Sequence, residues 1–154
     1  MKSLLLVLGA LALTACGTNA QHSGASPSGA PPKHGRISPP PAWIETSSGS
    51  HWLGYSSYCW SAPGTSMCAD MIAPSCTDDR TPRIELHRGE LVRFHLGFDP
   101  KEVSISVDES SPKSLQVTRE PTSHADIEGV MLLFTRGGGG DAGYVACLQF
   151  TEAT

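Results

Sequence analysis

The sequence predicts an all-β protein: an immunoglobulin-like antiparallel β-sandwich with two disulfides, preceded by a signal peptide and a disordered tether. Three observations lead to this fold class. Short runs of alternating apolar and polar residues follow one another from Trp43 onward. Clusters of Gly, Pro, Asp and Ser separate these runs, and no stretch has the 3.6-residue period of a helix. A small barrel is the alternative, but the order of strands and turns favours the sandwich.

The clearest strand of the predicted domain, residues 43–154, is 103–107. Val103, Ile105 and Val107 point to one face of this strand and two serines to the other, as the two-residue period of a β-strand requires. Such alternation predicts one buried and one solvated face. Further alternating runs lie at 84–86, at 91–96, in the shorter segment 115–117 and at 144–150.

Glycines and one continuous apolar run complete the strand pattern. Arg88-Gly89 is the expected turn between the first two runs, because glycine tolerates a positive φ. The run 130–134 is apolar throughout, as expected for a central strand that is buried on both faces. The glycines at 137–140 are expected to form a flexible hairpin loop, since the Lys-Ser/Thr of a phosphate loop is missing.

The N-terminus has the three parts of an export signal. Met1-Lys2 supplies a positive start, 4–13 is an apolar run too short to span a bilayer, and Thr14-Ala15 precedes Cys16. This segment resembles bacterial lipoprotein signals, in which the cysteine receives a diacylglyceryl group, with acyl chains such as palmitate, and becomes the mature N-terminus. We therefore expect 1–15 to be removed and Cys16 to be lipidated. An ordinary cut near Ala20 is the alternative.

Residues 16–42 are expected to be a lipidated N-terminus followed by a disordered tether. Gly, Ser, Pro and Ala make up most of this segment, and Ile37 is its one sizeable aliphatic residue. Such a composition buries too little apolar surface to offset the entropy of ordering the chain.

The charge distribution argues against nucleic acid as a partner. All fifteen acidic residues lie between Glu45 and Glu152, against eight lysines and arginines in the same range, so this part carries a net charge of about −7. An acidic surface of this kind keeps an exported protein soluble.

Four further cysteines predict two disulfides, because an even number is typical of an exported domain. Three pairings are possible. We favour Cys59–Cys68, which closes a short local loop, and Cys76–Cys147, which ties an early loop to the last strand. Free buried thiols are the alternative. Thiol redox chemistry is not indicated, since no Cys-x-x-Cys pair is present.

The segment 57–71 carries a resemblance to a family. Its Tyr58-Cys59-Trp60, followed by Cys68-Ala69-Asp70, resembles a motif of uncharacterised small bacterial lipoproteins and secreted β domains with Tyr-Cys-Trp and a later Cys-x-Asp-Tyr. The resemblance implies that Cys59 and Cys68 are bonded and that Trp60 packs nearby. This chain departs from the motif in having Met71 where an aromatic residue is usual. The family implies no chemistry and no cofactor.

Metal binding and catalysis have weak candidates only. His51, Met67 and Met71 have the soft donors of a Cu(I) site, which would make the protein an envelope metal-handling protein. Methionine in a small domain is more commonly core filler. A hydrolase would need an unrecognised loop-borne site, because there is no Gly-x-Ser-x-Gly. We name no catalytic, cofactor or metal residue.

Three tryptophans, Trp43, Trp52 and Trp60, cluster early in the domain and are a possible ligand platform. Their alternative role is to fill the core beside a disulfide. The sequence therefore predicts a non-enzymatic binding domain, anchored by lipid to the outer face of a bacterial cell or outer membrane. Its partner is expected to be a protein or a cell-wall or sugar ligand.

Overall fold

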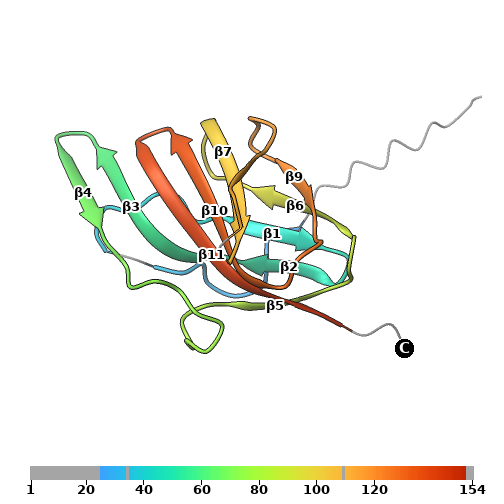
Figure 1. The fold of residues 1–154 in the computed structure, drawn as a ribbon. Helices are drawn as coiled ribbons and strands as arrows, with labels where there is room; N and C mark the ends of the chain where they lie inside the picture. The colour runs from blue at the N-terminus through green and yellow to red at the C-terminus, as the bar shows by residue number, and fades with distance from the viewer. Residues whose placement is uncertain (1–24, 34, 109, 152–154) are drawn as a thin grey trace, which may run out of the picture.

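The structure, a computed structural model, describes residues 25–33, 35–108 and 110–151. The predicted signal peptide and Cys16 lie outside these residues. Two β-sheets face one another across a single core, so the predicted β-sandwich is confirmed (Figure 1). The described chain contains no helix, and hence none that could cross a membrane.

Eleven strands build the two sheets. In chain order they are β1 (Trp43–Thr46), β2 (Gly49–Trp52), β3 (Gly54–Ala62), β4 (Thr65–Ala69), β5 (Arg83–Leu86), β6 (Leu91–His95), β7 (Pro100–Val107), β8 (Lys113–Ser114), β9 (Thr122–His124), β10 (Gly129–Gly137) and β11 (Gly140–Phe150).

The strand order is that of an immunoglobulin-like sandwich. One sheet has the order β2-β1-β6-β9, and the other has the order β4-β3-β11-β10-β7-β8. Strands β1, β6 and β9 correspond to A, B and E of that fold, while β7, β8, β10 and β11 correspond to C, C′, F and G. All pairs are antiparallel except β5, which runs parallel to the second half of β11. Strands β2, β3, β4 and β5 are additions to this framework.

The alternation read from the sequence correctly identifies the inward faces. Val103 and Ile105 of β7 lie opposite Thr135 and Leu133 of β10, and these side chains point into the core. Tyr144 of β11 lies opposite Leu133 and is fully buried. Across the core, the other sheet contributes mainly Ile44, Val92, Phe94 and Leu96.

Two strand predictions are corrected. Residues 115–117 form no strand; the chain pairs with β7 slightly earlier, at β8, and then crosses to the opposite sheet. In β10, Met131 and Leu133 are fully buried, whereas Leu132 and Phe134 remain half-exposed. The central position of β10 therefore does not bury both of its faces, because the outer face of this sheet is only partly covered.

The β3–β4 hairpin was not predicted as a pair of strands. It extends the second sheet beyond β11 (Figure 1). Its Trp60 lies opposite Gly140, beside the turn between β10 and β11. That turn is tighter than the predicted flexible loop, because only two residues separate the strands. A Cβ at Gly139 would lie 2.8 Å from the Trp60 ring, so the backbone approaches the indole as closely as only glycine allows.

Both predicted disulfides are present. Cys59 and Cys68 lie directly opposite one another in the β3–β4 hairpin. Cys147 lies on the outward side of β11 and is bonded to Cys76, in the loop that precedes β5. This loop also contributes the carbonyl of Pro82, which accepts a hydrogen bond from the Cys147 amide at 2.7 Å.

Residues 37–42, which the sequence assigns to the tether, pack on the domain. Ala42 and Pro39 are fully buried. The hydroxyl of Tyr144 donates to the Pro40 carbonyl at 2.7 Å, and that of Tyr55 donates to the Pro39 carbonyl at 2.8 Å. Prolines lack N–H groups, so the backbone of this proline-rich strap is held largely through its carbonyls.

We expect the longer disulfide to stabilise the domain more than the shorter one. In the chain-entropy model a separation of 71 residues corresponds to about 4 kcal/mol, and one of 9 residues to about 3 kcal/mol. Guanidinium unfolding of Cys76→Ala/Cys147→Ala and of Cys59→Ala/Cys68→Ala measures the two losses. A larger loss for the hairpin pair would contradict this ranking.

Tyr144→Phe should loosen the strap and change the alkaline stability. The variant leaves the Pro40 carbonyl without its donor, which should lower the free energy of unfolding by about 1–2 kcal/mol at neutral pH. Burial raises the pKa of Tyr144 above its ordinary value of 10, so its contribution is complete below pH 10 and is lost as the pH rises. Urea unfolding between pH 7 and pH 11 should show a shallower alkaline decline for the variant, and parallel curves would refute this role.

Candidate functional site

The three tryptophans do not form one platform. Trp43 and Trp52 are cross-strand neighbours on the outer face of the four-stranded sheet, and both are half-buried. Trp60 belongs to the other sheet, is only 8 % exposed and packs edge-on against Phe98 with ring centroids 5.0 Å apart. Trp60 therefore belongs to the core and is not part of the predicted ligand platform.

The remaining pair is partly covered by its neighbours. The Trp43 ring stacks on His95 at a centroid distance of 3.5 Å, and Trp52 Nε1 donates to the Gly29 carbonyl at 3.4 Å. His95 in turn contacts the carboxylates of Glu45 and Glu120 at 3.0 and 3.5 Å. Since one face of Trp43 is covered by His95, these side chains stabilise the sheet surface and do not present a flat aromatic patch.

The proposed copper donors lie in different parts of the fold. His51 is on β2, at the edge of one sheet, while Met67 is on β4, at the edge of the other. Met71 follows β4 and lines a small hollow with residues such as Tyr55 and Arg80, to which neither of the other two donors contributes. Within the described ranges no three His, Cys, Asp or Glu side chains are placed to hold a metal ion.

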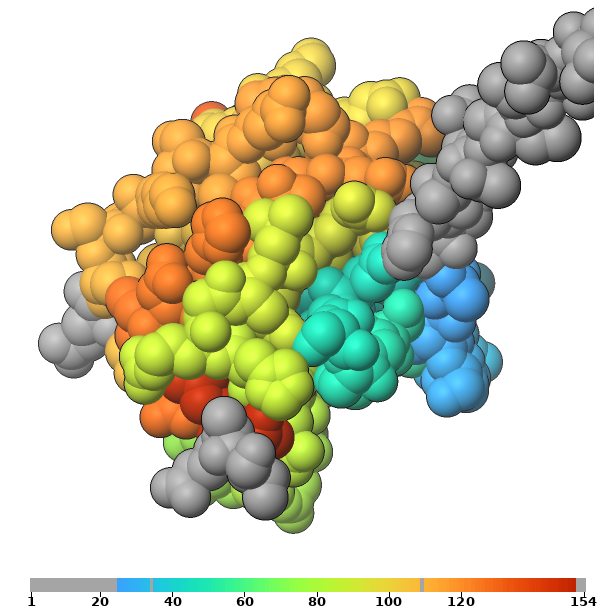
Figure 2. Space-filling view, turned by 90° about the vertical axis from the view of Figure 1, so that its right-hand side faces the viewer, coloured from blue at the N-terminus to red at the C-terminus, as the bar shows by residue number. Residues whose placement is uncertain are grey.

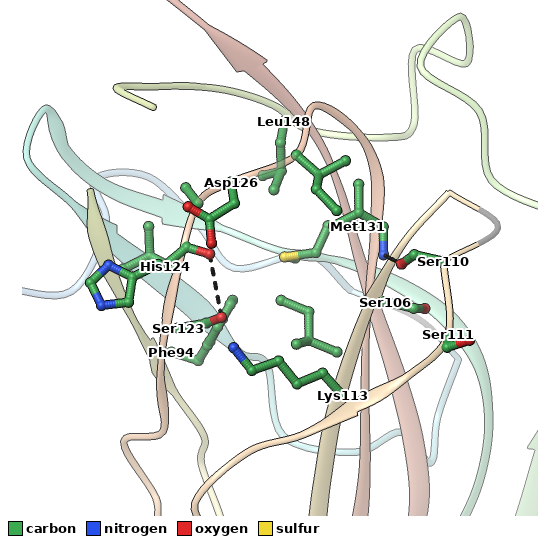
Figure 3. A pocket seen from close by; sticks show the side chains of 15 residues that line it. Phe94, Ser106, Ser110, Ser111, Lys113, Ser123, His124, Asp126, Met131 and Leu148 are labelled. Atoms are coloured by element: carbon green, nitrogen blue, oxygen red, sulfur yellow. Dashed lines mark hydrogen bonds between the residues drawn. The ribbon is translucent and has the colours of Figure 1, made fainter. Parts of the chain in front are cut away.

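A cavity with a largely apolar lining lies between the two sheets. It lies at the edge of the sandwich where β9 closes one sheet and β7 and β8 close the other (Figure 3). Seen from the right-hand side of Figure 1, the segment leading through β9 (orange) lies above the β5–β6 region (yellow-green) and the β1–β2 hairpin (teal) (Figure 2).

The cavity follows from the small residues of β9. Ser123 is the inward neighbour of Val92, and Ala125 follows two residues later, also buried. The facing sheet places Met131 and Val107 opposite one another on its inner side. A serine and an alanine cannot reach these side chains, so a volume of about 210 Å³ remains between the sheets.

The cavity has an apolar interior and a polar rim. The interior is lined by Val92, Phe94, Ile105, Val107, Ala125, Met131 and Leu148, and the exposed Ile127 lies at its margin. The rim carries Ser106, Ser110, Ser111, Lys113, Ser123, His124 and Asp126. An apolar concave surface with a few polar groups at its margin is the usual composition of a small-molecule binding site.

Three of the rim side chains are hydrogen-bonded to backbone groups. His124 Nδ1 donates to the Gly89 carbonyl at 3.1 Å, and Figure 3 shows its ring turned away from the cavity. Ser110 Oγ accepts from the Val107 amide at 2.9 Å, and Ser123 Oγ donates to the His124 carbonyl at 3.4 Å. The geometry therefore suits binding and does not pair a nucleophile with a base.

Sequence reasoning did not identify this cavity. The segment around Ser123 carries no alternating aliphatic residues, so β9 was not predicted as a strand. The one indication in the sequence is that residues 122–125 have no large apolar side chain. This indicates a cavity only when the side chains of the opposite sheet are known as well.

Comparisons of the chain with protein-family models, with curated proteins and with solved structures found no match.

Proposed function

We propose that the protein is a binding domain of the bacterial cell envelope, anchored through a lipid on Cys16, that holds a small and largely apolar molecule between its two sheets. The observation that carries the proposal is the cavity of about 210 Å³ with an apolar interior and a polar rim. An apolar cavity of about 150 Å³ in another protein is large enough to bind benzene. The volume here suits one aromatic ring or a short aliphatic chain.

The expected affinity is modest. Each methylene removed from water contributes about 0.8 kcal/mol, so a chain of six contributes about 5 kcal/mol before the cost of immobilising the ligand. Without that cost the Kd would be about 0.2 mM, so the actual binding is weaker, with a Kd of about 1 mM or above. Such an affinity suits reversible binding of a molecule that is abundant in the cell envelope.

Occupancy of the cavity can be read directly from the methionine methyl groups. Met131 lines the cavity, whereas Met67 and Met71 lie elsewhere and serve as internal controls. In NMR spectra of the full chain labelled at the methionine methyls, benzene should shift the Met131 signal saturably and leave the two control signals in place.

A cavity-filling variant provides the matched control for that measurement. Ser123→Leu places an aliphatic side chain where the serine makes only a long hydrogen bond to its neighbour. It should preserve the fold and weaken benzene binding at least tenfold. An unmoved Met131 signal in the natural chain, or equal binding in Ser123→Leu, would refute the proposed site.

The anchor is tested by the intact mass of the protein purified from membranes. We expect a chain that begins at Cys16, carries covalent acyl groups and gains about four mass units on reduction of its two disulfides. Cys16→Ser should retain residues 1–15 and carry no acyl group. A natural chain that keeps its first fifteen residues, or that lacks fatty acid, would overturn the membrane anchor.

A further inference from the structure

The mouth of the cavity carries a cationic group, the ammonium of Lys113. Lys113 lies on β8, and Figure 3 shows its stem reaching across the mouth so that the ammonium group ends beside Ser123. Within the part of the chain that the structure describes, Lys113 forms no ion pair, whereas Arg80, Arg119 and Arg136 each contact a carboxylate. The charge of Lys113 is therefore available to a bound molecule.

Hydroxyl groups near Lys113 can donate hydrogen bonds to the same anionic group that the Lys113 ammonium would contact. Ser123 Oγ is bound to the His124 carbonyl at 3.4 Å, long enough to be exchanged for a better acceptor. Ser111 lies on the same rim. An ammonium group and hydroxyl donors above an apolar interior match a ligand with a hydrocarbon part and an anionic end.

The rim also carries one acidic group, Asp126. Asp126 follows β9 and forms no side-chain ion pair with Lys113 in the described structure. In Figure 3 the Ser123 hydroxyl lies between the Asp126 carboxylate and the Lys113 ammonium. An anion placed beside Lys113 would thus lie next to the Ser123 hydroxyl.

We infer that the cavity binds a short-chain or single-ring carboxylate, with the hydrocarbon part between the sheets and the carboxylate paired with Lys113 at the mouth. This inference rests on the proposed binding function and names the ligand class of the same site. No bond is formed or broken. The ligand is held by apolar burial and by one charge-assisted contact.

The test compares three probes of equal chain length, hexanoate, hexanol and hexylamine, on the full chain at neutral pH. The Met131 methyl shift reports binding. We expect hexanoate to bind about fivefold more tightly than hexanol, the difference expected of one partly exposed charge-assisted contact, and hexylamine to bind most weakly. The preference for hexanoate should shrink as salt is added.

Lys113→Met keeps the aliphatic stem and removes the charge, so it should bind hexanoate and hexanol equally. Lys101→Met, at an exposed position of β7 outside the cavity, is the matched control and should keep the preference. If hexanol binds as tightly as hexanoate to the natural chain, the ligand class is wrong while the cavity function stands. If no probe moves Met131, the proposed function itself fails.

Discussion

Strand β11 imposes the main constraint on this fold, because seven consecutive residues from Ala142 to Leu148 are buried and their backbone groups must be paired within the protein. Strand β10 satisfies one side of β11 along almost its whole length. The other side is divided between β3, which pairs antiparallel with the first half, and β5, which pairs parallel with the second half. The additional strands β3 and β5 therefore supply the backbone hydrogen bonds that one edge of the long buried strand β11 requires.

Contacts on both faces of β11 hold the segments around it in place: a disulfide on the outer face and the hydrogen bond to the proline-rich strap on the inner face. Between the end of β4 and β5 the chain returns along the outer face of the sheet, and the Cys76–Cys147 bond fixes it beside β11. On the inner face, Tyr144 reaches through the core to the Pro40 carbonyl. One strand thus links a loop on one face to the N-terminal strap on the other.

Local patterns in the sequence were sufficient for the strands whose inner face is apolar. The disulfide pairing was favoured among three possibilities and is found in the structure. The alternation around Val103 and the turn at Gly89 describe local geometry, and both are found in the structure. The β3–β4 hairpin, the strap and β9 are held by distant partners such as β11 and Tyr144, so no local periodicity marks them. The same limit applies to the cavity, since its size depends on how far Ser123 lies from the opposite sheet.

The position of the cavity at the edge of the sandwich limits how much the cavity lowers the stability of the domain. An enclosed apolar void of 210 Å³ would cost about 5 kcal/mol at the coefficient measured for core truncations, comparable to the whole stability of a small domain. At the edge beneath β9 the void opens to solvent at a polar rim, so water contacts part of its lining and the cost is smaller. The central strands β10 and β11 keep complete pairing, and the two disulfides constrain the chain elsewhere. A bound hydrocarbon chain would restore the missing contacts, so in the proposed function the small side chains at Ser123 and Ala125 leave the apolar surface whose burial would favour binding.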